Sequence, residues 1–233
     1  MRRPIFDRHP ALRGRVRFEA LADLPSPVVD HRGVLVKRDD AIGGGKIRKL
    51  EFYHPEGPVL AVGAEGSNWL RALAARRPVR ILTWPQHHNE HSLLNVPHIP
   101  GTHASSKVGF GLRMIGELPR LLVGSTTMAP IGGSDPVTTL GFVNAAFELA
   151  EQVERGECPK PDAVFVPLGT CGTAAGLALG FGLLGWEVAL HAVRITLPSS
   201  ARLGKVRALA LQTTRLLDAS PRFCPLRLEK GFY

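Results

Sequence analysis

Cysteine is scarce in this chain of 233 residues, and Cys158, Cys171 and Cys224 lie far apart without a CxxC pair. This spacing excludes a disulfide framework and a structural zinc motif, and it is typical of free thiols in a reducing compartment. Long apolar runs are also absent, because residues 174–184, the most apolar stretch, are few and interrupted by glycines. The arginine-rich N-terminal segment lacks the apolar region of a secretory signal. We therefore expect a cytoplasmic protein that does not bind or cross a membrane.

Acidic residues are outnumbered by basic ones, which gives a formal net charge of +9 and an isoelectric point near 10.1. A positive field of this kind attracts nucleic-acid phosphates without sequence specificity. The arginines are scattered, however, and the chain has no aromatic-interleaved basic patch, helix-turn-helix pattern or zinc-finger spacing. Nucleic acid is therefore not the expected partner, and a basic nucleic-acid binder stays open as an alternative that salt-sensitive binding to duplex DNA would reveal.

Strand-like and helix-like segments alternate along the chain. An apolar run of strand length at 163–168 is followed by a glycine-threonine turn and an all-apolar helix, and then by a strand at 188–195 and a helix at 201–217. This order predicts an α/β fold whose parallel sheet is flanked by helices. The other expected elements are strands at 34–37, 59–62, 79–84 and 121–124, helices at 47–53, 68–75 and 112–118, a long helix from Asp135 to near Gly156, and a loop at 85–109.

Three glycines, residues 43–45, precede Lys46 in the stretch GGGKIRKLE. A nucleotide-binding P-loop is excluded, because Asp40 stands where its first glycine is needed and Ile47 where a hydroxyl would bind magnesium. Two interpretations remain. Either Lys46 is an exposed lysine in a flexible loop, or the glycines bring a helix start close to a ligand and Lys46 is a partly desolvated, nucleophilic amine.

A second glycine-rich turn, Gly169-Thr170-Cys171-Gly172-Thr173, lies between the apolar strand and the apolar helix. At this place a parallel sheet presents backbone N–H groups and a helix dipole, and the two threonines add hydroxyl donors. The turn lacks the GxGxxG spacing of dinucleotide-binding proteins. It is therefore either a phosphate site or a structural tight turn.

Two weaker candidates lie between residues 66 and 91. Gly66-Ser67-Asn68 begins an expected helix, where it serves as an N-cap or binds a carboxylate or a ring hydroxyl. His87 and His91 would share a face of a helix, and His88 lies between them. Their proline and asparagine neighbours favour a solvated loop over a metal site, so no metal is expected.

The order of these motifs along the chain is more informative than each alone. KRDD is followed by GGGKIRKLE, GSNWLR, IGGSDPVTTLGFVNAAFELAEQ and GTCGTAAGL. In this order the chain resembles the 1-aminocyclopropane-1-carboxylate (ACC) deaminase and D-cysteine desulfhydrase family. The resemblance implies the tryptophan-synthase-β type fold of pyridoxal-phosphate enzymes, called fold type II. It further implies a larger cofactor-binding domain formed by residues 1–56 and 129–233, and a smaller inserted α/β domain, 57–128.

Carried over residue by residue, the resemblance makes Lys46 the lysine that forms the internal aldimine with pyridoxal 5'-phosphate. Asn68 matches the asparagine that contacts the ring hydroxyl of the cofactor, and Ser67 matches the serine near the substrate carboxylate. Gly169, Thr170, Cys171, Gly172 and Thr173 match the loop that holds the cofactor phosphate. The implied enzyme is a homodimeric lyase or deaminase that converts a small amino acid to a 2-oxo acid and ammonia.

The chain departs from the family pattern at four motif positions. Gly45 stands where the family has asparagine, Gly66 where it has glutamine, Trp69 where it has histidine, and Cys171 where it has glycine. Family members also extend beyond the position of Tyr233, and their C-terminal part supplies active-site tyrosines and the group facing the pyridine nitrogen. The alternative is therefore a shortened relative that binds the cofactor weakly or not at all and is catalytically inactive.

Overall fold

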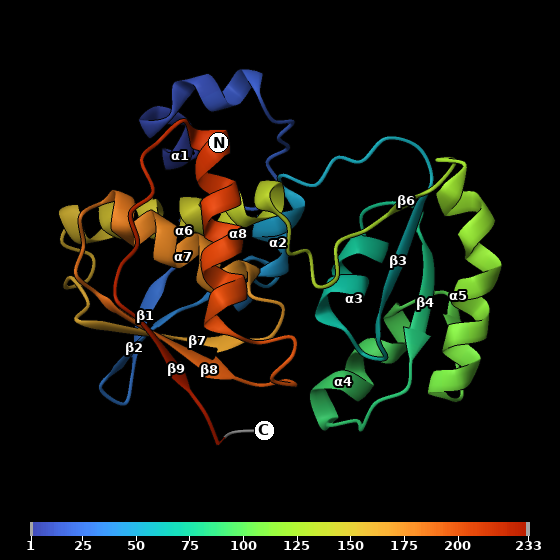
Figure 1. The fold of residues 1–233 in the computed structure, drawn as a ribbon. Helices are drawn as coiled ribbons and strands as arrows, with labels where there is room; N and C mark the ends of the chain where they lie inside the picture. The colour runs from blue at the N-terminus through green and yellow to red at the C-terminus, as the bar shows by residue number, and fades with distance from the viewer. Residues whose placement is uncertain (1, 232–233) are drawn as a thin grey trace. The chain divides into compact units, whose positions relative to one another are not determined.

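The computed structural model describes residues 2–231 and divides them into two compact units (Figure 1). The larger unit contains the residues up to Tyr53 and those from Ser134 onward, and the smaller unit is His54–Gly133. The sequence places the inserted segment at 57–128. No helix in the described part of the chain is long and apolar enough to cross a membrane.

A parallel sheet forms one side of the larger unit, as the alternating pattern predicts. Its strands are β7 (Ala163–Leu168), β8 (Ala189–Arg194) and β9 (Leu226–Glu229), hydrogen-bonded in that order. A separate antiparallel hairpin pairs β1 (Val28–His31) with β2 (Val34–Lys37). The predicted α/β class with a parallel sheet is thereby confirmed.

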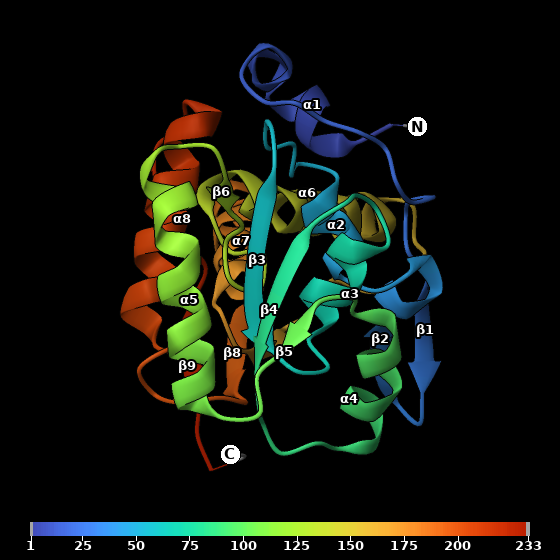
Figure 2. The same ribbon diagram turned by 90° about the vertical axis from the view of Figure 1, so that its right-hand side faces the viewer.

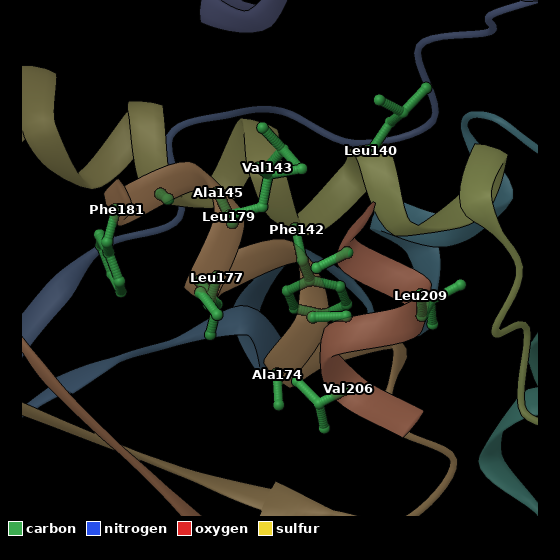
Figure 3. Packing of buried hydrophobic residues seen from close by; sticks show 14 of the residues in the cluster. Leu140, Phe142, Val143, Ala145, Ala174, Leu177, Leu179, Phe181, Val206 and Leu209 are labelled. Atoms are coloured by element: carbon green, nitrogen blue, oxygen red, sulfur yellow. The ribbon is translucent and has the colours of Figure 1, made fainter. Parts of the chain in front are cut away.

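The helices of the larger unit enclose an apolar core (Figure 3). They are α1 (Pro4–Arg8), α2 (Lys46–Leu50), α6 (Pro136–Glu154), α7 (Gly172–Leu183) and α8 (Leu203–Leu217), with short 3-10 helices η1 (Pro10–Gly14) and η2 (Asp39–Ile42). Phe142 of α6, Leu177 of α7 and Val206 of α8 meet in this core. Helix α7 is apolar on all sides because it packs against α6, α8 and the sheet. Its start is thereby held rigidly at the end of β7.

The smaller unit is a four-stranded parallel sheet with helices on both faces. Figure 2 shows α5 on one face of the sheet and α3 on the other. The strands lie in the order β5 (Thr102–His103), β4 (Arg80–Trp84), β3 (Val59–Ala64) and β6 (Thr127–Met128). The helices are α3 (Asn68–Ala74), α4 (Glu90–Asn95), the short 3-10 helix η3 (Val96–His98) and α5 (Lys107–Leu122).

The segment between residues 85 and 128 corrects two predictions. The expected strand at 121–124 is wrong, because α5 continues to Leu122 and the strand is β6. The expected loop at 85–109 contains α4, whose N-cap is Asn89: the Asn89 side chain accepts from the Ser92 backbone N–H, and the Ser92 hydroxyl accepts from the Asn89 backbone N–H. Apolar periodicity is misleading here, since Leu112 and Leu122 of α5 are exposed at 65% and 81%.

Candidate functional site

Lys46 is the first residue of α2, directly after a tight glycine turn. Gly43 and Gly44 both have positive φ, 92° and 93°, which reverses the chain between η2 and α2. The side chain of Lys46 is half-buried, and burial lowers its pKa from 10.5 to about 8. Of the two interpretations of this lysine, the exposed residue in a flexible loop is therefore wrong, and Lys46 is a partly buried amine that loses its proton more easily than an ordinary lysine.

Arg48 connects α2 to neighbouring segments through hydrogen bonds. Its guanidinium is 1% exposed and donates to Glu148 of α6 at 2.9 and 3.0 Å and to Asp39 at 2.7 and 2.9 Å. It also donates to the Ser26 hydroxyl at 2.8 Å. Arg48 thus ties the segment before the glycine turn to the long central helix, so that the start of α2 is held from both sides.

Lys49 lies one turn after Lys46, and motif reasoning missed its importance. Its side chain is 1% exposed, and Nζ donates to the Ser134 hydroxyl at 3.0 Å. Burial, followed by the nearby charge of Lys46, lowers the pKa of Lys49 well below its ordinary value. A buried ammonium is unfavourable by itself, so an anion beside Lys49 would stabilise it.

Lys49 and Ser134 meet the turn between β7 and α7. Ser134 Oγ lies 2.7 Å from Thr170 Oγ1 and accepts from the Gly172 backbone N–H at 3.3 Å. A Cβ atom at Gly172 would lie 2.8 Å from Lys49 Nζ and 2.7 Å from Ser134 Oγ, so a larger residue would displace these two groups. Two hydroxyls, an ammonium and a helix N-terminus therefore converge at this turn, which is the donor set of a phosphate site.

Cys171 takes part in this turn through its backbone. Its φ of 78° lies in the left-handed region, where the resemblance has glycine. The thiol is 3% exposed and Sγ lies 3.4 Å from the Ser200 carbonyl oxygen. The side chain therefore packs into the core, and the other members of the predicted set, Gly169 and Thr173, flank it along the turn.

Ser67 and Asn68 belong to the smaller unit. Ser67 is the N-cap of α3, and its hydroxyl accepts from the Leu70 N–H at 3.5 Å. Asn68 is exposed, and its Oδ1 accepts from His91 Nε2 at 3.0 Å and from Asn95 Nδ2 at 2.8 Å. His91 thus contacts the predicted site residue Asn68. The spacing of the histidines suggested a metal ligand and did not indicate this contact.

The remaining histidine candidates are not arranged as metal ligands. His88 Nε2 lies 3.1 Å from Glu65 Oε2. Among residues 2–231, no three His, Cys, Asp or Glu side chains are grouped so that they could hold a metal ion. The candidate residues of the two units carry amines, hydroxyls, amides and backbone N–H groups.

Comparisons with known proteins agree with this chemistry. Residues 123–218 match the family model described as pyridoxal-phosphate dependent enzyme. The mitochondrial bifunctional D-cysteine desulfhydrase/1-aminocyclopropane-1-carboxylate deaminase of Arabidopsis thaliana is 29% identical, over 76% of this chain and 54% of that protein. D-cysteine desulfhydrase of Klebsiella pneumoniae is 28% identical, over 81% of this chain and 66% of that protein. The chain therefore spans between about half and two thirds of the length of these relatives.

A solved structure extends the likeness to the fold. The crystal structure of an ACC deaminase homologue matches 98% of this chain and 77% of its own, with a TM-score of 0.73 and 25% identity. Together these likenesses show that the chain has the fold of the pyridoxal-phosphate-dependent enzymes of fold type II. Within this class its relatives are the ACC deaminases and D-cysteine desulfhydrases, so the resemblance predicted from the motifs is confirmed.

Proposed function

We propose that the chain holds pyridoxal 5'-phosphate and acts as a lyase or deaminase on a small amino acid, as an enzyme of the ACC deaminase or D-cysteine desulfhydrase type. The observation that carries this proposal is the arrangement of Lys46 and Lys49 on α2, one an amine of lowered pKa and the other beside the β7–α7 turn. The products would be a 2-oxo acid and ammonia.

The turn fits the phosphate of this cofactor. Lys49 supplies the charge, Thr170 and Ser134 supply hydroxyls, and the start of α7 supplies N–H groups and a favourable dipole. Glycine at position 172 lets the Lys49 amine and the Ser134 hydroxyl lie close to the backbone at the start of α7. In this proposal the phosphate balances the buried charge of Lys49, so cofactor binding and the local electrostatics support each other.

Pyridoxal phosphate supplies an aldehyde that joins amino groups and a ring that withdraws electrons from the attached carbon. Lys46 offers the amine for this attachment, because near pH 8 a large fraction of it is neutral. Lys46 Nζ would also hold and move a proton at the substrate. Asn68 would donate to the ring hydroxyl oxygen, and Ser67 would bind the substrate carboxylate.

Three further assignments belong to the same proposal. The larger unit is the cofactor-binding domain, and the smaller unit is the inserted domain. The protein works in the cytoplasm, which its buried free thiols Cys158, Cys171 and Cys224 support. It assembles as a homodimer, which the resemblance supports.

The test is the visible absorbance of the purified protein after addition of pyridoxal phosphate and removal of the excess. We expect an absorbance band that is lost in Lys46→Ala, while the circular dichroism of the variant shows that it remains folded. An identical spectrum in both proteins would contradict the assignment of Lys46.

Turnover is tested separately with D-cysteine and 1-aminocyclopropane-1-carboxylate. We expect at least one of them to yield a 2-oxo acid in the wild type and neither in Lys46→Ala. A cofactor band without product from either compound would favour the alternative, a relative that binds the cofactor without turnover.

A further inference from the structure

Asn95 lies buried at the end of α4, in a set of hydrogen bonds that fixes the orientation of its amide. Its Oδ1 accepts from Arg71 Nη1 at 2.8 Å. Because a guanidinium can only donate, this contact identifies the oxygen end of the amide. The other end, Nδ2, donates to the Gly66 carbonyl oxygen at 2.9 Å and to Asn68 Oδ1 at 2.8 Å.

The orientation of Asn95 determines that of Asn68. Nδ2 of Asn95 is a donor, so Asn68 must turn its oxygen toward it. His91 Nε2 approaches the same oxygen at 3.0 Å and uses its second lone pair. Within residues 2–231 the Asn68 side chain makes no other hydrogen bond, and the residue is exposed. Its Nδ2 group therefore faces outward as a donor.

Gly66 makes this arrangement possible. Its φ is +74°, and a Cβ atom there would lie 2.5 Å from the Ser92 carbonyl oxygen, inside van der Waals contact with α4. The family has glutamine at this position, whose side chain would collide with α4. The departure at Gly66 thus lets α4 approach the start of α3 closely enough for Asn95 to reach Asn68.

We propose that Asn95 is a positioning residue that holds the amide of Asn68 with its donor end toward an anionic oxygen. This inference rests on the proposed function, in which that oxygen is the ring hydroxyl of the cofactor. A donor at this place favours the ionised form of the hydroxyl. Arg71 and His91 complete the arrangement, Arg71 by orienting Asn95 and His91 by occupying the remaining lone pair of Asn68 Oδ1.

The test is Asn95→Asp, which has nearly the same shape. The new carboxylate keeps its bond from Arg71 but offers Asn68 an acceptor in place of a donor. Asn68 should then turn its Nδ2 group inward and its oxygen outward. The matched control is Asn89→Asp, which adds the same charge to α4 but keeps the N-cap acceptor.

The first readout needs no cofactor. In wild type, the side-chain NH2 signal of Asn68, assigned by its loss in Asn68→Asp, should exchange rapidly with solvent. In Asn95→Asp, the exchange of the Asn68 NH2 protons should slow at least about tenfold, because this group now donates to the new carboxylate at position 95. The Asn89→Asp control should match wild type. Rapid exchange of Asn68 in both proteins would overturn the inference, even if the cofactor assignment fails.

The second readout uses the loaded protein. The visible band of ionised ring hydroxyl should lose intensity to the band of the neutral form in Asn95→Asp, and the affinity for pyridoxal phosphate should fall about tenfold. An unchanged band and affinity in a folded variant would overturn the positioning role. If Asn95→Asp does not fold, Asn95→Ala removes the donor that orients Asn68 and should shift the same bands in the same direction, and an unchanged spectrum in that variant would overturn the inference.

Discussion

The larger unit contains buried charged residues near its candidate site, whereas Ser67 and Asn68, the candidates of the smaller unit, are neutral. Lys49 and Arg48 are each 1% exposed and close to other charges, and their contacts join segments that are far apart in the chain. Ser67 and Asn68 use hydroxyl and amide groups at the start of a short helix. Because buried charges interact strongly and exposed neutral groups weakly, changes in the larger unit should have the greater effects.

The largest effect is expected from Arg48→Met. Removing the guanidinium leaves the buried Glu148 carboxylate with Lys37 as its cation and the Ser26 N–H as a donor, and it breaks the ion pair of Asp39 beside the glycine turn. The free energy of unfolding of the larger unit should fall by about 3 kcal/mol, measured by urea titration. The control is Arg38→Met, which breaks an exposed pair with Asp40 and should leave the urea midpoint unchanged. Equal shifts for the two variants would contradict the role of burial.

Lys49→Met separates stability from binding. Without cofactor, removal of a buried amine of lowered pKa should raise the free energy of unfolding by about 1–2 kcal/mol. Affinity for pyridoxal phosphate should fall about 10- to 100-fold, as expected for a lost charge-assisted hydrogen bond to phosphate. Urea titration and fluorescence titration measure the two quantities. A variant that is both less stable and equally able to bind would show that Lys49 is structural.

The rate of cofactor attachment to Lys46 should depend on pH in a way that reports the burial of this amine in the larger unit. Because burial lowers its pKa to about 8, its neutral fraction should rise about tenfold from pH 7 to pH 9 and then level off. The measurement is the initial rate of cofactor attachment to Lys46, divided at each pH by the rate of attachment to N-acetyl-lysine amide. For a lysine of ordinary pKa this ratio would not change with pH. The same shift destabilises the fold below pH 8, and this cost disappears as the pH rises from 8 toward 10.5.

The smallest effects should come from the helix caps, one in each unit. Asp135 of the larger unit accepts from the Thr138 N–H at 2.7 Å and has a reciprocal bond, whereas Ser67 accepts from Leu70 at 3.5 Å. Asp135→Ala should therefore cost about 1–2 kcal/mol and Ser67→Ala about 0.5 kcal/mol, by urea titration. A greater loss for Ser67→Ala would mean that Ser67 has a structural role beyond its cap.

Local patterns predicted a large part of this molecule. The β7–turn–α7 unit was found because an apolar strand, a glycine-threonine turn and an apolar helix follow one another without interruption. Lys46 was found through its glycine turn and the order of the motifs. In both cases the signal and the structure lie within the same few residues.

The parts that were missed depend on contacts between distant segments. Lys49 and Ser134 are far apart in the sequence, and only the packing of α2 beside α6 brings Nζ to Oγ. Asn95 follows two exposed leucines in a segment predicted as a loop, so no local pattern indicates its burial. Strand β9 has only four residues, too few for periodicity to reveal it. The RKLE and GGSDP motifs did contain Lys49 and Ser134, but no pattern distinguished them from charged and capping residues.

The most direct test of the central claim is to reduce the cofactor-loaded protein with borohydride and to locate the modified lysine by peptide mass spectrometry. If Lys46 is the attachment site and Lys49 binds the phosphate, the pyridoxyl group will lie on Lys46, and Lys49 will remain unmodified beside the β7–α7 turn. The Lys49→Met variant should carry the same modification at Lys46, at higher cofactor concentration. Modification of Lys49 instead, or of exposed lysines such as Lys107 and Lys160 to the same extent as Lys46, would contradict the account.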